Sequence, residues 1–213
     1  MSDSPLIQLD DAAVMAGSVQ ILRGLHVDVA AGEILGVFGA NGAGKTTLLR
    51  LVGTLITPSA GTGTVLGASL TGEDRFDVRH RIGYVGHVPG LYPELTLAEN
   101  LSFSAASREI GQDAVDRCLA SVGLAGAASR RAAMCSHGMQ RRAEFARVLM
   151  TEPDILLLDE PHSALDEDAI DLVDGIVQRT VSAGGAAVLV SHDKERVLSL
   201  ADRTMEVREG TLV

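Results

Sequence analysis

Alternating hydrophobic and polar positions mark the first part of the chain. Stretches such as Leu6-Ile7-Gln8-Leu9 and Leu25-His26-Val27-Asp28-Val29 place an apolar side chain at every second position, which is typical of strands with one buried face. Strands of this kind usually pair in antiparallel sheets. We therefore expect an N-terminal antiparallel β-subdomain up to about residue 29.

Continuous apolar runs follow, and they predict strands that are covered on both faces. They alternate with stretches of helical periodicity, so we expect a largely parallel α/β sheet in one domain, residues 1–213, with a mostly helical lobe inserted at about 88–150. The expected buried strands are 34–38, 155–158 and 186–190, with another strand at about 64–66, and the expected helices are 45–52, 96–108, 112–123, 137–151 and 166–182.

Composition excludes several classes of protein. Of the 213 residues, 18 are Lys or Arg and 28 are Asp or Glu, and the net charge of −10 argues against a protein held to nucleic acid or anionic lipid by a general positive field. Cys118 and Cys135 lack metal-ligand spacing and suit a reducing compartment. With no signal-peptide pattern and no run of about 18 apolar residues, we expect no membrane insertion.

A phosphate-binding loop follows the first buried strand. The segment Gly39-Ala40-Asn41-Gly42-Ala43-Gly44-Lys45-Thr46 matches G-x-x-x-x-G-K-[ST] and precedes a helical pattern. Backbone N–H groups of such a loop point at phosphate oxygens, the lysine reaches the β- and γ-phosphates, and the Thr46 hydroxyl binds Mg²⁺. The candidate ATP-binding residues are Gly39, Ala40, Asn41, Gly42, Ala43, Gly44, Lys45, Thr46 and Thr47.

An acid pair ends the strand at 155–158. Asp159 is the expected holder of Mg²⁺, and Glu160 is the candidate base that orients and deprotonates a water. Successive side chains at a strand end point to opposite sides, so the two acids serve different purposes. No Asn-Lys-x-Asp element is present, which disfavours a GTPase and leaves ATPase and kinase open.

Three further motifs make the chain resemble the ATP-binding-cassette (ABC) ATPases over nearly its whole length. They are Ser136-His137-Gly138-Met139 before Gln140-Arg141-Arg142, Ser163-Ala164-Leu165-Asp166, and Ser191-His192-Asp193. The resemblance implies a RecA-like P-loop NTPase core, ATP and Mg²⁺ as cofactors, and two cassettes packed head to tail. Each ATP then lies between the phosphate loop of one cassette and the signature, residues 136–139, of the other.

The same resemblance implies roles for single residues. Ser136 caps a helix and faces the partner's γ-phosphate, His192 contacts the γ-phosphate and helps hold the water, and residues 163–166 cross the dimer interface, with Asp166 also a good N-cap. His87 stands where the family has a Gln that contacts Mg²⁺ or its water, so it is a candidate catalytic and metal residue. The signature departs from Leu-Ser-Gly-Gly-Gln, and Ala16 replaces the aromatic residue that stacks on adenine.

The stretch from Gly86 to Leu101 resembles the ATP-binding subunits of the haem exporters of cytochrome c biogenesis. The ABC resemblance as a whole implies a homodimer when ATP is bound, on the cytoplasmic face of the membrane and coupled to integral membrane permease subunits. The haem-exporter resemblance implies that those permeases are the exporter's membrane subunits, and we expect no nucleic-acid partner. The alternatives are the ATPase of a drug, polysaccharide or lipid exporter, and a soluble ABC ATPase. A P-loop kinase leaves Ser136 and His192 unexplained.

Overall fold

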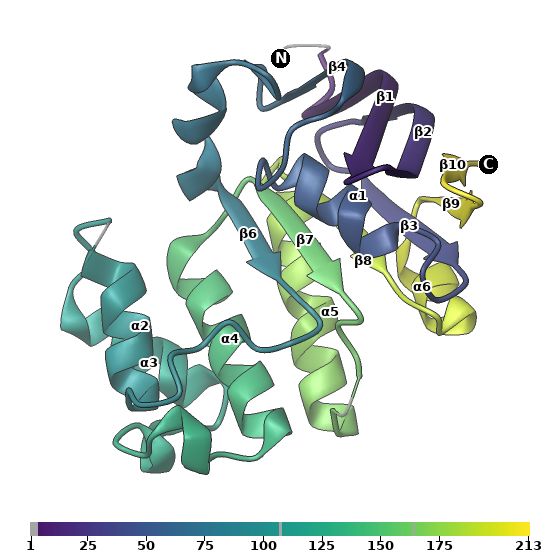
Figure 1. Ribbon diagram of the computed structural model, residues 1–213. Coiled ribbons are helices and arrows are strands. Elements are labelled where there is room, and N and C mark those ends of the chain that lie inside the picture. Colours follow the sequence, from purple (N-terminus) through teal and green to yellow (C-terminus); the bar gives the residue numbers. More distant parts are fainter. Residues whose placement is uncertain (1–3, 107, 164) are drawn as a thin grey trace. The chain divides into compact units, whose positions relative to one another are not determined.

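The computed structural model describes residues 4–106, 108–163 and 165–213, and the chain separates into two compact units (Figure 1). The first unit holds the described residues up to Tyr84 with Pro153–Pro161 and Val177–Val213, and the second holds Val85–Glu152 and His162–Ile176. The predicted lobe at about 88–150 falls within the second unit, while the single domain over residues 1–213 stays a prediction.

A four-stranded antiparallel sheet in the first unit agrees with the N-terminal alternation. Its strands lie in the order β2-β1-β4-β5, and Ile7 of β1 pairs with Val29 of β2 on one side and Val65 of β4 on the other. Ile7 and Leu9 are buried while the residue between them is exposed, as the period of two predicts. The strands are β1 (Ile7–Ala16), β2 (Val19–Val29), β4 (Ala60–Val65) and β5 (Ala68–Ser69).

The continuous apolar runs form the middle of a six-stranded sheet with the order β10-β9-β3-β8-β7-β6. The strands β3, β8 and β7 run parallel, and Val190 pairs with both Val37 and Asp159. The carboxyl ends of these strands therefore meet at one edge of the sheet. The strands are β3 (Ile34–Gly39), β6 (Ile82–Val85), β7 (Ile155–Asp159), β8 (Ala186–Val190), β9 (Arg203–Arg208) and β10 (Thr211–Leu212).

Gly36 lets two elements approach the centre of strand β3. A Cβ atom at Gly36 would overlap Val197 Cγ1 of helix α6 (Lys194–Leu200), and it would lie 3.0 Å from Ala201 Cβ and 3.1 Å from Thr204 Cγ2 of β9. Neither α6 nor β9 was predicted from the sequence. The absence of a side chain at Gly36 is what allows both to pack closely on β3.

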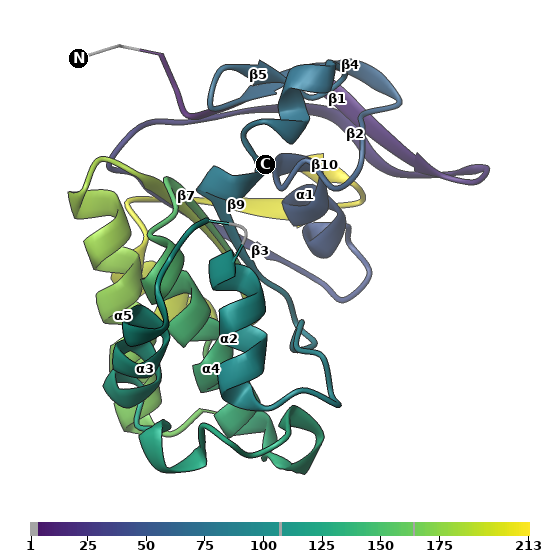
Figure 2. The same cartoon turned by 90° about the vertical axis from the view of Figure 1, so that its left-hand side faces the viewer.

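The second unit is built from helices with a core of their own. Helices α2 (Leu97–Ala106), α3 (Gln112–Ser121) and α4 (His137–Thr151) lie side by side in Figures 1 and 2. Apolar residues including Leu101, Leu119 and Ala143 form the buried cluster between them. Helix α5 (Glu167–Ser182) begins in this unit and ends in the first.

Capping residues fix the ends of these helices. Thr96 Oγ1 accepts the Glu99 N–H at 3.1 Å and the Glu99 carboxylate accepts the Thr96 N–H at 2.7 Å, which is a capping box before α2. Helix α3 ends at Ser121, two residues earlier than predicted, and Gly123 follows it with a φ of 72°. Over the part of the chain that the structure describes, no helix has both the length and the apolar character to cross a bilayer.

Candidate functional site

The phosphate loop lies between β3 and helix α1 (Lys45–Val52), as predicted. Gly39, Gly42 and Gly44 have φ values of 147°, 79° and 111°, in the region that favours glycine. A Cβ on Gly44 would lie 2.7 Å from Leu22 Cδ2. The glycines thus permit the turn and close packing on β2, and they leave the N–H groups at the start of α1 available to an anion.

Lys45 is buried at the base of the loop. Its side chain is 8% exposed, and Nζ donates to the carbonyl oxygens of Gly39 at 2.7 Å and Ala40 at 3.0 Å. The ammonium group is therefore held against the inner side of the loop, where a bound phosphate would meet it.

The structure brings Thr46 and Asp159 together across 113 residues of sequence. The Thr46 hydroxyl donates to Asp159 Oδ2 at 2.7 Å, and Asp159 is 3% exposed at the end of β7. A hydroxyl and a carboxylate at hydrogen-bond distance form an oxygen donor set of the kind that Mg²⁺ prefers.

Glu160 is held by the segment after β8. Its carboxylate accepts the Ser191 hydroxyl at 2.9 Å and the His192 N–H at 3.0 Å, and His192 Nδ1 lies 2.8 Å from Oε2. The Glu160 side chain is 14% exposed and that of His192 is 75% exposed. Glu160 and His192, predicted from separate motifs, therefore share one cluster, and the contribution of Ser191 was not predicted.

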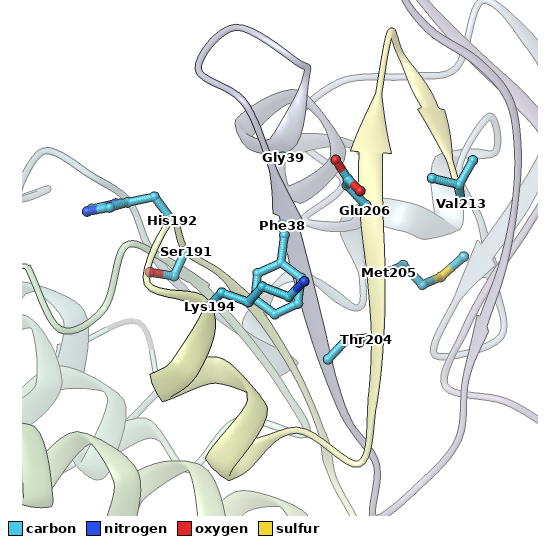
Figure 3. Close-up of a pocket in the computed structure, with 9 residues that line it drawn as sticks. All are labelled: Phe38, Gly39, Ser191, His192, Lys194, Thr204, Met205, Glu206 and Val213. Carbon is cyan, nitrogen blue, oxygen red and sulfur yellow. The ribbon is translucent and has the colours of Figure 1, made fainter.

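A cavity of about 370 Å³ adjoins this cluster (Figure 3). Gly39, Ser191 and His192 line one part of it, while Lys194 lies near the Phe38 ring with Nζ 5.8 Å from the ring centroid. Lys45 and Asp159 do not line this cavity. It therefore lies next to the predicted phosphate site and is distinct from it.

The predicted signature lies in the second unit, at the start of α4. Ser136 is the N-cap, and its hydroxyl oxygen accepts the Met139 N–H at 3.2 Å. Ser136 and His137 are exposed, and Gly138 and Met139 are half-buried. Beside them, burial raises the pKa of the Cys135 thiol, against the effect of Arg130. The helix cap is confirmed, whereas contact with a partner's ATP stays a prediction.

His87 and the predicted interface loop also belong to the second unit. His87 is exposed in the segment after β6, and Asp166 caps α5 by accepting the Ala169 N–H at 3.0 Å. Ser163 and Leu165 are half-buried, and Ala164 lies outside the described residues. The role of His87 at the metal and the interface role of residues 163–166 stay predictions.

Two polar pairs in the second unit were not predicted. His162 Nε2 lies 2.8 Å from Asp174 Oδ1, and Arg141 Nη1 lies 3.4 Å from Glu144 Oε2. In the sequence His162 lies between the acid pair and the predicted interface loop, and this position could have indicated the His162–Asp174 pair. For Arg141 and Glu144 the signal was their spacing of three residues on a predicted helix.

Comparison with known families decides the assignment. The sequence profile described as ABC transporter matches residues 22–163. The chain belongs to the ABC transporter family. A solved structure, "Dimeric Structure of MJ0796, a Bacterial ABC Transporter Cassette", has a TM-score of 0.87 at 25% identity and covers 97% of this chain and 96% of that one. The predicted fold class and the predicted enzyme class, an ABC-type ATPase, are confirmed.

Curated ABC relatives differ in what their names say they transport. Aliphatic sulfonates import ATP-binding protein SsuB 2 of Burkholderia cenocepacia (strain HI2424) is 39% identical over 94% of this chain and 73% of its own length. Cytochrome c biogenesis ATP-binding export protein CcmA 2 of Cupriavidus metallidurans is 35% identical over 91% of this chain and 92% of its own length. The chain is an ABC ATP-binding subunit, and the predicted haem-exporter type is not singled out.

Proposed function

We propose that this ABC cassette binds Mg·ATP at the phosphate loop and hydrolyses it with Glu160 as the general base. The observation that carries the proposal is the hydrogen-bonded pair Thr46–Asp159 next to Glu160, whose carboxylate is held by Ser191 and His192. The pair proposed to hold Mg²⁺ and the proposed base thus lie together where β7 ends.

Magnesium fits the residues present. Thr46 Oγ1 and Asp159 Oδ2 are hard oxygen donors 2.7 Å apart, and Mg²⁺ in nucleotide sites usually takes one or two protein ligands with phosphates and waters. When bound, the ion would be held by Thr46 and Asp159 and would neutralise negative charge on the phosphates.

Glu160 would act on the attacking water. The water oxygen forms a bond to the γ-phosphorus, the bond from that phosphorus to the β,γ-bridging oxygen breaks, ADP leaves with the electron pair, and the water proton passes to the Glu160 carboxylate. Ser191 and His192 fix the direction of that carboxylate through their hydrogen bonds. A positioned base of this kind contributes about 10²–10⁴ in rate.

We further propose that two copies of the cassette close on two ATP molecules, with Ser136 of each facing the nucleotide of the other. The dimeric MJ0796 cassette supports this arrangement, as does the exposed N-cap position of Ser136. Membrane permease subunits would receive the motion, which places the cassette at the cytoplasmic face of the membrane.

For the cargo we propose the haem-export pathway, on the resemblance carried by the sequence from Gly86 to Leu101. SsuB 2, named for sulfonate import, supplies the competing prediction. Deleting the gene should abolish haem-stained c-type cytochromes and leave growth on aliphatic sulfonates as sulfur source intact. The reverse result assigns the cassette to import. Permease genes beside this reading frame provide an independent check.

The ATP site is tested with the two lysines of the chain, Lys45 and Lys194. Lys45→Ala should weaken Mg·ATP binding by about tenfold or more in calorimetry, because a charge-assisted hydrogen bond to phosphate is lost. Lys194→Ala is the matched control and should bind as the wild type does. Equal affinity in both variants contradicts the assigned phosphate loop.

A further inference from the structure

The segment that presents His87 is short, and its middle is exposed to solvent. It comprises residues 86–90, here called the His87 loop, and follows directly on β6. His87 is exposed and Val88 is 75% exposed. The side chains of His87 and Val88 thus do little to fix the position of the loop, and bonds to its backbone matter more.

Two side chains of α4 supply such bonds, one at each end of the loop. Arg141 Nη1 donates to the Gly86 carbonyl oxygen, and Glu144 Oε1 accepts the Gly90 N–H at 2.8 Å. His87 and Val88 lie between these two points and are exposed. The ends of the loop are therefore tied to α4 while its middle projects into solvent.

The two side chains are also bound to each other and buried. Arg141 Nη1 lies 3.4 Å from Glu144 Oε2, and both side chains are 1% exposed. Burial raises the pKa of Glu144, while the Gly90 N–H, Arg141 and Arg147 act in the opposite direction. Replacing a buried ion pair with apolar residues is often neutral for stability. The pair is therefore better explained by the two backbone groups that it holds than by its own attraction.

We propose that Arg141 and Glu144 are positioning residues that fix the His87 loop to α4, so that His87 and the signature serine move together. Ser136 caps the same helix five residues before Arg141, so the two ties attach the His87 loop to the helix that carries the signature serine. The inference rests on the proposed function in one respect, namely that His87 takes part in ATP hydrolysis. Arg141 and Glu144 themselves touch no substrate.

The first test replaces both charges at once. Arg141→Met with Glu144→Leu removes the two ties and leaves neither buried charge without its partner. The Gly90 amide should exchange its hydrogen at least about tenfold faster in deuterium exchange. The kcat of ATP hydrolysis should fall about tenfold while KM for Mg·ATP changes less than about twofold, because the phosphate loop is untouched. Unchanged exchange and kcat in this variant overturn the proposal.

The matched control is Arg108→Met. Arg108 Nη1 donates to the Thr151 carbonyl oxygen at the other end of α4, so this variant also removes an arginine anchored on that helix. It should leave exchange in the His87 loop and kcat unchanged. If it alters both as the double variant does, the effect comes from general loosening of the unit and the proposal fails.

A second pair of variants leaves α4 intact and decides the question if the double variant does not fold. Gly90→Pro removes the N–H that Glu144 accepts, whereas Gly90→Ala keeps it and places Cβ at an ordinary 3.6 Å from Glu144 Oε1. Faster exchange at residues 86–88 and lower kcat in the proline variant alone support the proposal. Equal behaviour overturns it. Absence of ATP binding by the wild type would instead contradict the proposed function.

Discussion

Glu160 adopts a backbone conformation that residues other than glycine rarely adopt. Its φ is 51°, and such a residue in the left-handed region stores about 1–3 kcal/mol of strain. Its N–H donates to the Val190 carbonyl oxygen at 2.8 Å, and its carboxylate is bound by Ser191 and His192. The bonds that hold the carboxylate in place therefore also oppose relaxation of the backbone.

Removing one of these bonds should slow catalysis without preventing ATP binding. Ser191→Ala removes the hydroxyl that donates to Glu160 Oε2 at 2.9 Å. A hydrogen bond to a charged group is worth about 1.5–3 kcal/mol, so kcat should fall about 10- to 100-fold. Steady-state kinetics with Mg·ATP measures the effect, and Ser199→Ala on α6 is a control whose hydroxyl donates to the Arg196 carbonyl oxygen instead. A kcat within about twofold of wild type would show that Ser191 does not position the base.

At this scale the sequence located the loop between β3 and α1 and the acid pair at the end of β7, because Lys45, Thr46, Asp159 and Glu160 lie in contiguous motifs. Their chemical roles stay predictions. The bond from Ser191 to Glu160 could not be derived, since 31 residues separate them and only the pairing of β7 with β8 brings them together. The spacing of a motif describes residues that are close along the chain, whereas Ser191 and Glu160 are brought together by neighbouring strands of the sheet.

Among the elements, β3 leaves little room for a side chain at Gly36. Gly36→Ala would bring a Cβ into Val197, Ala201 and Thr204, and overpacking of this kind costs about 1–3 kcal/mol. The free energy of unfolding from urea titration should fall by that amount. Gly175→Ala is the opposite case, because Gly175 lies within α5 with nothing within 4 Å of its Cβ position. It should raise stability by about 0.5–1 kcal/mol. Equal changes in the free energy of unfolding for the two variants would show that α6 and β9 do not pack closely on Gly36.

Glu144 in helix α4 should make the free energy of unfolding depend on pH. Because burial raises the pKa of Glu144 above its ordinary value, folding favours the protonated carboxyl. Its stabilising contribution is complete below the unfolded pKa of about 4.3 and is lost as pH rises through the higher folded value. The wild type should therefore lose stability relative to Glu144→Gln as pH rises from about 4.3 through mildly acidic values. Urea unfolding of both proteins over this range measures the difference. A difference in the free energy of unfolding that does not change with pH, or that changes in the opposite direction, contradicts the raised pKa.

Toward the end of the chain the predictions succeeded for some elements and failed for others: β8 lies where the strand 186–190 was predicted, whereas α6 and β9 were not predicted. The range 137–151 agrees with α4, because Ser136 is an N-cap that the sequence displays. Strand β9 was not predicted, since only Val207 in it is buried and its exposed polar residues hide any periodicity. Its place in the sheet depends on pairing with β3, which no local pattern records.

At the scale of the whole molecule, the net charge of −10 opposes the proposed closing of two copies. Like charges repel over a Debye length of about 10 Å at 0.1 M salt, and added salt weakens this repulsion. The ATP-bound dimer of Glu160→Gln, which should turn over slowly, should therefore tighten severalfold between about 50 and 300 mM NaCl. Sedimentation equilibrium measures the dimer constant. Weaker association at high salt would mean that complementary charges at the interface outweigh the net repulsion.

The sequence also indicated how the chain is organised, within limits. It placed helical periodicity at about 88–150, and the structure gathers Val85–Glu152 in one compact unit. It did not reveal that His162–Ile176 belongs to the same unit, because apolar periodicity on α5 runs on without interruption into the first unit. The unit to which a helical segment belongs is determined by the residues that pack against it, and helical periodicity in the sequence does not indicate those residues.

The bonds of Lys45 affect how any affinity of this cassette should be understood. Its ammonium group already has the Gly39 and Ala40 carbonyl oxygens as acceptors, so an arriving phosphate competes with the protein's own backbone for the same protons. Nucleotide binding is then an exchange of acceptors, and the measured dissociation constant is the difference between two bonded arrangements. A substitution that distorts the carbonyls of residues 39 and 40 could strengthen ATP binding without touching ATP.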